Sequence, residues 1–111
     1  MAASQSFANN IIEGNLGSKI QGEVVSNFNF PWSMSFIGND HLLVATKPGK
    51  LWLVDSFGSK TEVKNIMNIQ YGGQGGMGDV VPHPNYKKNK YIYLSYITSD
   101  DGGMTRYAVV D

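Results

Sequence analysis

The sequence lacks cysteine altogether and carries few charges. With no cysteine among the 111 residues, neither a disulfide framework nor a thiolate metal site can form. Nine basic and nine acidic residues give a formal net charge of zero. The one basic cluster, residues 87–90 (KKNK), is interpreted as the solvated turn of a hairpin. Nucleic acid is therefore not expected as the main partner, because nucleic-acid binding requires a basic face.

Long apolar runs are missing as well. No stretch approaches the ~20 apolar residues that a membrane-spanning helix requires. Residues 1–15 have neither the basic region nor the apolar core of a signal peptide. Apolar residues still make up 41% of the chain, enough to form a folded core. The length leaves room for one small domain and not comfortably for two.

Strand-like segments dominate the rest of the chain. Residues 1–18 are polar and are expected to form an N-terminal tail or a lead-in loop, whereas residues 19–111 alternate short apolar segments with turn residues. No segment shows a helical pattern. The expected strands are residues 20–25, 32–37, 41–46, 51–55 and 60–63, and then 77–81, 91–96 and 105–110.

These strands form two groups. The first group has four strands within about residues 30–66, and the second has three within about residues 76–111, where a fourth would be expected. Four-stranded antiparallel units repeating about every 40–50 residues are typical of β-propeller blades. Because closure needs about four blades or more, the chain is expected to be part of a longer protein. A small complete β-sandwich or open barrel is the alternative that the periodicity leaves open.

A glycine-rich loop lies between the two groups. Five glycines within residues 72–78 allow positive φ angles and a close approach of the backbone to a ligand or a neighbouring strand. Gln74 is the only side chain within residues 72–76, so the loop is predicted to present this amide to a ligand. A phosphate-binding loop is excluded, because it would need a Lys-Ser/Thr pair and a following helix.

The other polar candidates are interpreted as structural. His83 lies in a His-Pro turn, and His41 follows an Asn-Asp turn. Asp79 is expected to bond the glycine loop. Asp100 and Asp101 belong to a turn that lacks the alternating oxygen ligands and closing glutamate of a calcium loop.

The aromatic residues are expected to serve packing and association. Trp32 and Trp52 lie on strands among apolar neighbours and are interpreted as core between sheets, not as a sugar-stacking platform. Residues 91–96 (YIYLSY) are expected to form an exposed, apolar blade edge. Such an edge recruits other strands, so the isolated chain is expected to self-associate.

Four segments in fixed order carry a resemblance to a known family. They are PWSMSF (31–36), LLVATKPGKL (42–51), GQGGMGDVVPHPNY (73–86) and YIYLSY (91–96). The chain resembles the N-terminal part of the soluble glucose/sorbosone dehydrogenase family, whose pattern is close to PWGLAFLP…LLVTERPGRL…GQGGLLDVALHPDF…YVYLSYS. Three departures are Ser33, where the family usually has glycine, and Gly78 and Pro82, where leucine is common.

The resemblance implies a six-bladed β-propeller, of which this chain holds the first blade and most of the second. Family members oxidise the anomeric hydroxyl of an aldose to the lactone, passing a hydride to pyrroloquinoline quinone (PQQ) with a histidine as general base. Calcium ions hold the quinone and the structure, and the electrons pass to a quinone or a cytochrome. The resemblance also implies a periplasmic or secreted protein.

One functional residue is carried over by this resemblance. Gln74 matches the family's active-site glutamine, which contacts the sugar and the quinone. The resemblance places three features beyond Asp111: the general-base histidine, the cationic residues that bind PQQ, and the calcium ligands. No catalytic residue, metal ligand or complete cofactor site is therefore assigned within this chain. The isolated chain is expected to be inactive without the rest of the propeller. A non-catalytic binding or scaffold propeller with the same blade motif is the alternative.

Overall fold

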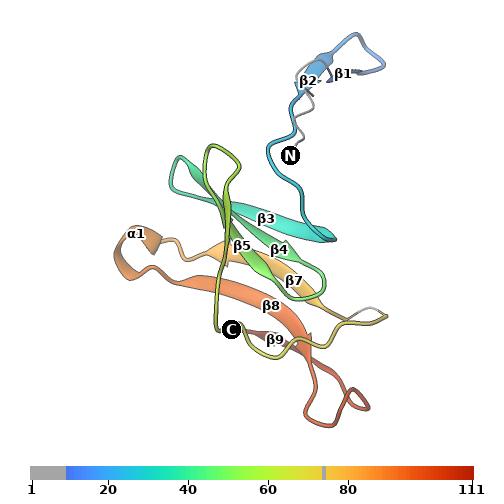
Figure 1. Cartoon of the computed structure of the whole chain (residues 1–111), viewed down its shortest axis with the longest axis vertical. Helices are drawn as coiled ribbons and strands as arrows, with labels where there is room; N and C mark the ends of the chain where they lie inside the picture. The colour runs from blue at the N-terminus through green and yellow to red at the C-terminus, as the bar shows by residue number, and fades with distance from the viewer. Residues whose placement is uncertain (1–9, 74) are drawn as a thin grey trace.

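Three antiparallel sheets follow one another along the chain (Figure 1). The structure, a computed structural model, describes residues 10–73 and 75–111. Within these residues it has nine strands and one helical turn, so the predicted all-β class is confirmed. No helix in the described ranges is long and apolar enough to cross a membrane.

A two-stranded hairpin comes first and stands apart from the other sheets (Figure 1). It pairs β1 (Asn10–Glu13) with β2 (Lys19–Gly22). The strand β1 was not predicted, because residues 1–18 were expected to be a tail or a lead-in loop and Ile11-Ile12 is the only apolar pair there. The strand expected over residues 20–25 is shorter, since β2 ends at Gly22.

The second sheet contains the four strands predicted for the first group, in sequential order β3-β4-β5-β6. Turn chemistry explains the order: the Asp55 carboxylate, for example, accepts hydrogen bonds from the backbone N–H groups of Phe57 and Ser59 at the β5–β6 turn. The strands are β3 (Pro31–Ile37), β4 (His41–Thr46), β5 (Leu51–Val54) and β6 (Lys60–Glu62).

The third sheet has the order β7-β8-β9, formed by β7 (Met77–Pro82), β8 (Ile92–Thr98) and β9 (Tyr107–Val110). The strand β8 is therefore paired on both sides, and the expectation that residues 91–96 form an exposed edge is wrong. Tyr96, which pairs with Val109, is only 7% exposed.

A single helical turn, α1 (Tyr86–Asn89), joins β7 to β8, although no helix was predicted. Lys90 ends it in the left-handed conformation (φ 60°), and its N–H donates to the Tyr86 carbonyl at 2.8 Å. One turn is too short to show a helical period in the sequence. The lysines of residues 87–90 are solvent-exposed, as predicted for a turn between strands.

The core lies where the second and third sheets face each other. Leu43, Ala45 and Leu51 pack there with Met77 and Val80, and all five are buried. Together the two sheets form one packed unit, and the glycine-rich loop connects them.

The large apolar side chains Trp32, Met34 and Phe36 of β3 are exposed, whereas the serines between them are half-buried. Ser33 faces the third sheet, where its Oγ donates to the Gly78 carbonyl at 2.7 Å. Trp32, Met34 and Phe36 are 61%, 64% and 69% exposed. The core position predicted for Trp32 is therefore wrong, because its ring lies at the surface beside the glycine-rich loop; Trp52 is half-buried.

Candidate functional site

The glycine-rich loop, residues 72–76, closes on itself through backbone hydrogen bonds. The Gly75 N–H donates to the Gly72 carbonyl at 2.8 Å, and the Gly76 N–H donates to the Gln70 carbonyl at 2.6 Å. Gln74, the residue predicted to present its amide to a ligand, lies outside the described residues. The structure thus gives the backbone on both sides of the candidate residue.

Backbone bonds also attach the loop to both large sheets. The Met77 N–H donates to the Lys47 carbonyl, in the β4–β5 turn of the second sheet, at 3.0 Å. In the third sheet, the Ile97 N–H donates to the Gly76 carbonyl at 2.9 Å, and the Ile97 carbonyl accepts from the Gln70 N–H at 2.7 Å. The loop is therefore anchored by hydrogen bonds at the junction of the two sheets.

Gly76 is a position of the loop where a side chain does not fit. Its φ of +106° lies in the region that side chains rarely adopt, and a Cβ there would overlap the Lys47 carbonyl. The glycine-rich loop thus approaches a neighbouring backbone closely, although at Gly76 this backbone is the β4–β5 turn and not the ligand or strand that was predicted.

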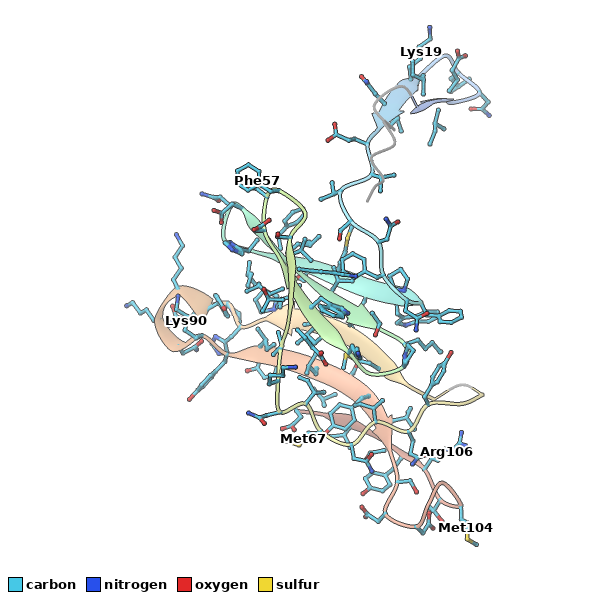
Figure 2. All side chains as sticks on the ribbon, viewed as in Figure 1. Lys19, Phe57, Met67, Lys90, Met104 and Arg106 are labelled. Carbon is cyan, nitrogen blue, oxygen red and sulfur yellow. The ribbon has the colours of Figure 1, made fainter. Side chains whose placement is uncertain are left out.

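Arg106 is a functional candidate that sequence reasoning missed. It lies 34 positions from Gly72, and its Nη1 donates to the Gly72 carbonyl at 3.0 Å (Figure 2). Arg106 stands out in the sequence as the sole arginine of the chain. Its position in the sequence, however, does not predict that it contacts the glycine-rich loop. It brings a permanent positive charge to one end of the glycine-rich loop.

A pocket of about 250 Å³ lies beside the loop, on the side of Lys47. The Lys47 Nζ lies 4.2 Å from the centroid of the Trp32 ring. Burial, and then the nearby Asp111 carboxylate, raise the pKa of the Tyr96 phenol, so it stays neutral at physiological pH. The lining residues are Trp32, Lys47, Gly75, Gly76, Met77, Gly78, Ser95, Tyr96, Ile97 and Ala108.

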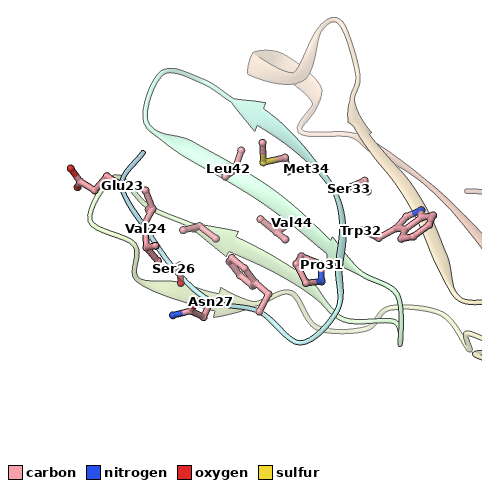
Figure 3. Close-up of a pocket in the computed structure, with 13 residues that line it drawn as sticks. Glu23, Val24, Ser26, Asn27, Pro31, Trp32, Ser33, Met34, Leu42 and Val44 are labelled. Atoms are coloured by element: carbon pink, nitrogen blue, oxygen red, sulfur yellow. The ribbon is translucent and has the colours of Figure 1, made fainter. Parts of the chain in front are cut away.

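A larger pocket, of about 750 Å³, lies on the outer face of the second sheet (Figure 3). The extended segment of residues 23–28 crosses this face and forms one wall, opposite side chains such as Met34, Val44 and Val54. Glu23 is the only ionisable residue in its lining. The lining of this larger pocket is mostly apolar and contains no acid–base pair, so it suits packing against another part of a protein. The glycine-rich loop is therefore the better candidate for a catalytic or binding site.

The two histidines have structural partners. The His83 Nδ1 accepts from the Asn85 N–H at 2.9 Å, and its ring centroid lies 5.8 Å from that of Tyr93, so the predicted turn role is confirmed. It lies at the end of β7 opposite the glycine-rich loop. The His41 Nδ1 lies 2.8 Å from the Asp40 Oδ1 at the surface turn before β4.

Asp79 does not bond the loop as expected. Its Oδ1 accepts from the Val80 N–H at 2.9 Å, while its own N–H donates to the Ser95 Oγ at 2.8 Å, at the point where the β7–β8 register is irregular. The carboxylate therefore stabilises a strand irregularity. Within residues 10–73 and 75–111 no three His, Asp or Glu side chains gather closely enough to hold a metal ion.

The β8–β9 loop, which carries Arg106, is organised by Asp101. The Asp101 Oδ1 accepts from the Thr105 N–H at 2.8 Å and from the Ser99 Oγ at 2.7 Å, and that Oγ accepts from the Gly103 N–H at 2.9 Å. These hydrogen bonds, above all the one from the Thr105 backbone, lower the pKa of Asp101 to about 2. The predicted turn is confirmed, with a carboxylate at its centre.

We expect the β8–β9 loop to loosen in acid. A lowered folded-state pKa means that the stabilisation is present above the unfolded value of about 4 and is lost as the pH falls toward 2. Asp101→Asn should lower the protection of the Thr105 amide against hydrogen exchange by less than about tenfold at pH 5, because the loop is exposed. Asp100→Asn is the control, since Asp100 accepts from the Tyr107 hydroxyl instead. Equal protection of Thr105 in wild type and Asp101→Asn would contradict this role.

Comparison with known proteins shows which family this chain resembles. Residues 28–111 match the glucose/sorbosone dehydrogenase family. An aldose sugar dehydrogenase of Escherichia coli (YliI) is 30% identical over 82 residues, which cover 71% of this chain and 22% of the relative. The structure of the PQQ-bound aldose sugar dehydrogenase of Streptomyces coelicolor superposes with a TM-score of 0.65 at 25% identity, covering 78% of this chain and 25% of that one.

A second solved structure is similar to this chain to the same degree. The apo-form of the soluble aldose sugar dehydrogenase of Escherichia coli gives a TM-score of 0.66 at 27% identity, covering 74% of this chain and 24% of that one. The chain thus spans about a quarter of the length of the relatives that it matches. The family match extends over both large sheets and the glycine-rich loop between them, and the chain belongs to the glucose/sorbosone dehydrogenase family.

Proposed function

We propose that this chain is the N-terminal part of a PQQ-dependent aldose sugar dehydrogenase, and that its glycine-rich loop forms one wall of the active site. The observation that carries the proposal is a loop fixed by backbone bonds to two sheets, in a chain that belongs to the family. A loop whose backbone is hydrogen-bonded on both sides of residue 74 suits the positioning of one polar group. The full-length protein is the intact enzyme of which this chain is proposed to be the N-terminal part.

The proposed reaction is oxidation of the anomeric hydroxyl of an aldose to the lactone. When bound, PQQ supplies the acceptor for the hydride. The part that this chain plays is positioning: the Gln74 amide can donate to one sugar oxygen and accept from another, without adding a charge beside the reacting carbon. The general base, the residues that grip PQQ and the calcium ligands are assigned to the part of the protein beyond Asp111.

The charges around the loop suit an acidic cofactor nearby. Lys47 lines the pocket beside Gly75 and Gly76, the Arg106 guanidinium donates to the Gly72 carbonyl, and PQQ carries carboxylates. Two cations at the rim raise the local positive potential, which attracts such an anion. Calcium has no comparable support in the described ranges, where acidic side chains do not cluster.

The wider proposal concerns the architecture and surroundings of the full-length protein. We assign it a six-bladed propeller, with the second sheet as the first blade and the third sheet as most of the second. The exposed β3 side chains Met34 and Phe36 support this assignment, because an apolar sheet face requires a partner. A periplasmic or secreted location, with a quinone or a cytochrome as electron acceptor, completes the proposal.

The test is an oxidation assay on the full-length protein. We expect an aldose to reduce an artificial electron acceptor only after PQQ and calcium are added, with the lactone as product. The same protein without PQQ, and with PQQ but with chelator present, are the controls. No lactone in the fully reconstituted sample would refute the proposal and favour a non-catalytic propeller, because a fold does not fix a function.

A further inference from the structure

Trp32 and Lys47 lie together at the glycine-loop pocket. Both line the pocket of about 250 Å³, next to Gly75 and Gly76. Trp32 is 61% exposed, although tryptophan is largely buried on average, and it also lines the edge of the pocket of about 750 Å³. We propose that Trp32 and Lys47 form a sugar-stacking subsite beside the glycine-rich loop. This inference rests on the proposed function and adds a second contact for its substrate.

The direction of Trp32 comes from an irregularity in β3. The β3–β4 register shifts between Pro31 and Ser33, so Trp32 departs from the alternation of the strand. Figure 3 shows its ring on the opposite side of β3 from the side chains of Met34 and Val44. A bulge that re-aims one side chain toward a pocket is the kind of feature that occurs beside active sites.

Lys47 is fixed by its backbone. Its N–H donates to the Phe30 carbonyl at 2.9 Å, and its carbonyl accepts from the Met77 N–H at 3.0 Å. The Nζ then lies over the indole, 4.2 Å from the ring centroid. The two side chains therefore support each other through a cation–π contact, and the pair is held against the loop.

The chemistry of this pair fits a pyranose ring. The face of the indole that Lys47 leaves free can pack against the apolar C–H face of a sugar, while the cation–π contact with Lys47 holds the plane of the ring. The glycines of the pocket present backbone and no side chains, so a ring can come close to the loop. A neutral aldose held in this way would lie against Gly75 and Gly76 of the glycine-rich loop.

The chain contains a matched control pair. Trp52 on β5 has Lys50 5.8 Å and Lys60 4.9 Å from its ring, but it lines neither of the two pockets described above. A general effect of losing a tryptophan or a cation–π contact would appear at both sites. An effect of losing a sugar contact would appear only at Trp32.

The experiment compares variants of the full-length protein. In Trp32→Ala we expect the KM for the aldose to rise about tenfold, with kcat changed by less than about threefold and the KM for the electron acceptor unchanged. Trp32→Phe keeps an aromatic face and should recover most of the affinity. Lys47→Met should raise the KM about threefold. Trp52→Phe and Lys50→Met should behave as wild type.

A binding measurement separates this inference from the proposed function. In the protein without PQQ, glucose should quench tryptophan fluorescence in wild type and Trp52→Phe, but not in Trp32→Phe. If wild type oxidises aldoses while the Trp32 and Trp52 variants share one KM, the subsite is refuted and the proposed function stands. If reconstituted wild type forms no lactone, the proposed function fails, and lack of quenching by glucose would then overturn the subsite as well.

Discussion

Replacing Gln74 by alanine is expected to lower kcat/KM of the full-length protein for its aldose by about 100-fold. Removing one preorganised hydrogen-bonding group from an active site typically costs about 10²–10³ in rate. The loop around residue 74 is held by backbone hydrogen bonds that do not involve this side chain, such as Gly75 to Gly72 and Gly76 to Gln70, so the loop should persist in the variant. Steady-state kinetics with PQQ and calcium at saturation measures the effect.

The second glutamine at the loop provides the control. Gln70 contacts the loop through its backbone carbonyl, which accepts from Gly76, so Gln70→Ala should leave kcat/KM within about threefold of wild type. Gln74→Glu tests the chemistry, because a carboxylate accepts hydrogen bonds but cannot donate them. It should also lose activity. Wild-type kinetics in Gln74→Ala would contradict the assignment.

The strands of the two large sheets could be predicted because their turns are encoded locally. The Asp55 carboxylate organises the β5–β6 turn, and Gly38 takes a positive φ (69°) at the β3–β4 turn. The glycine-rich loop was recognisable for the same reason, since a run of glycines has few uses other than a close backbone approach. Local sequence patterns of this kind can be recognised without any knowledge of the tertiary structure.

The orientation of side chains could not be predicted in the same way. The pattern of β3 gives large and small residues on alternate faces, but only packing decides which face meets the third sheet. The small face does so, because β3 lies close to β7, and a bulge then turns Trp32 toward the loop. The contact between Arg106 and Gly72 depends likewise on how the β8–β9 loop folds back. Long-range contacts of this kind leave no periodic trace in the sequence.

Two departures from the family pattern lie against each other in the structure. Ser33, where the family usually has glycine, donates from its Oγ to the carbonyl of Gly78, where leucine is common. A Cβ at Gly78 would lie 2.6 Å from the Ser95 Oγ, which accepts from the Asp79 N–H. A side chain at position 78 would therefore meet Ser95 of β8, which explains the glycine, whereas the serine at position 33 is explained by its own hydrogen bond to β7.

The third departure, Pro82, is tolerated because of its place on β7. This strand is at the edge of its sheet and pairs only with β8. Since the His83 N–H donates to the Tyr91 carbonyl, the alternation of antiparallel pairing turns the nitrogen of residue 82 away from β8. Proline therefore removes no hydrogen bond of the ladder.

Replacing Gly76 by alanine is expected to destabilise the full-length protein by about 3 kcal/mol or more. The φ of +106° is unfavourable for alanine, and its Cβ would overlap the Lys47 carbonyl. Strained backbone conformations cost about 1–3 kcal/mol each, and the overlap adds to this because the carbonyl accepts the hydrogen bond from Met77 that joins the two sheets. Urea unfolding of the two proteins measures the difference.

Gly102→Ala separates the two causes of this effect. Gly102 also has a positive φ (73°), but no atom lies within 4 Å of a Cβ built there. Its replacement should cost only the conformational strain, about 1–2 kcal/mol. The additional loss of unfolding free energy in Gly76→Ala, compared with Gly102→Ala, then measures the cost of the overlap with the Lys47 carbonyl. Because that contact holds both the loop of Gln74 and the lysine over Trp32, Gly76→Ala should also raise the KM for the aldose, whereas Gly102→Ala should not. Equal losses of stability in the two variants would show that the sheet junction tolerates a side chain and does not fix the loop.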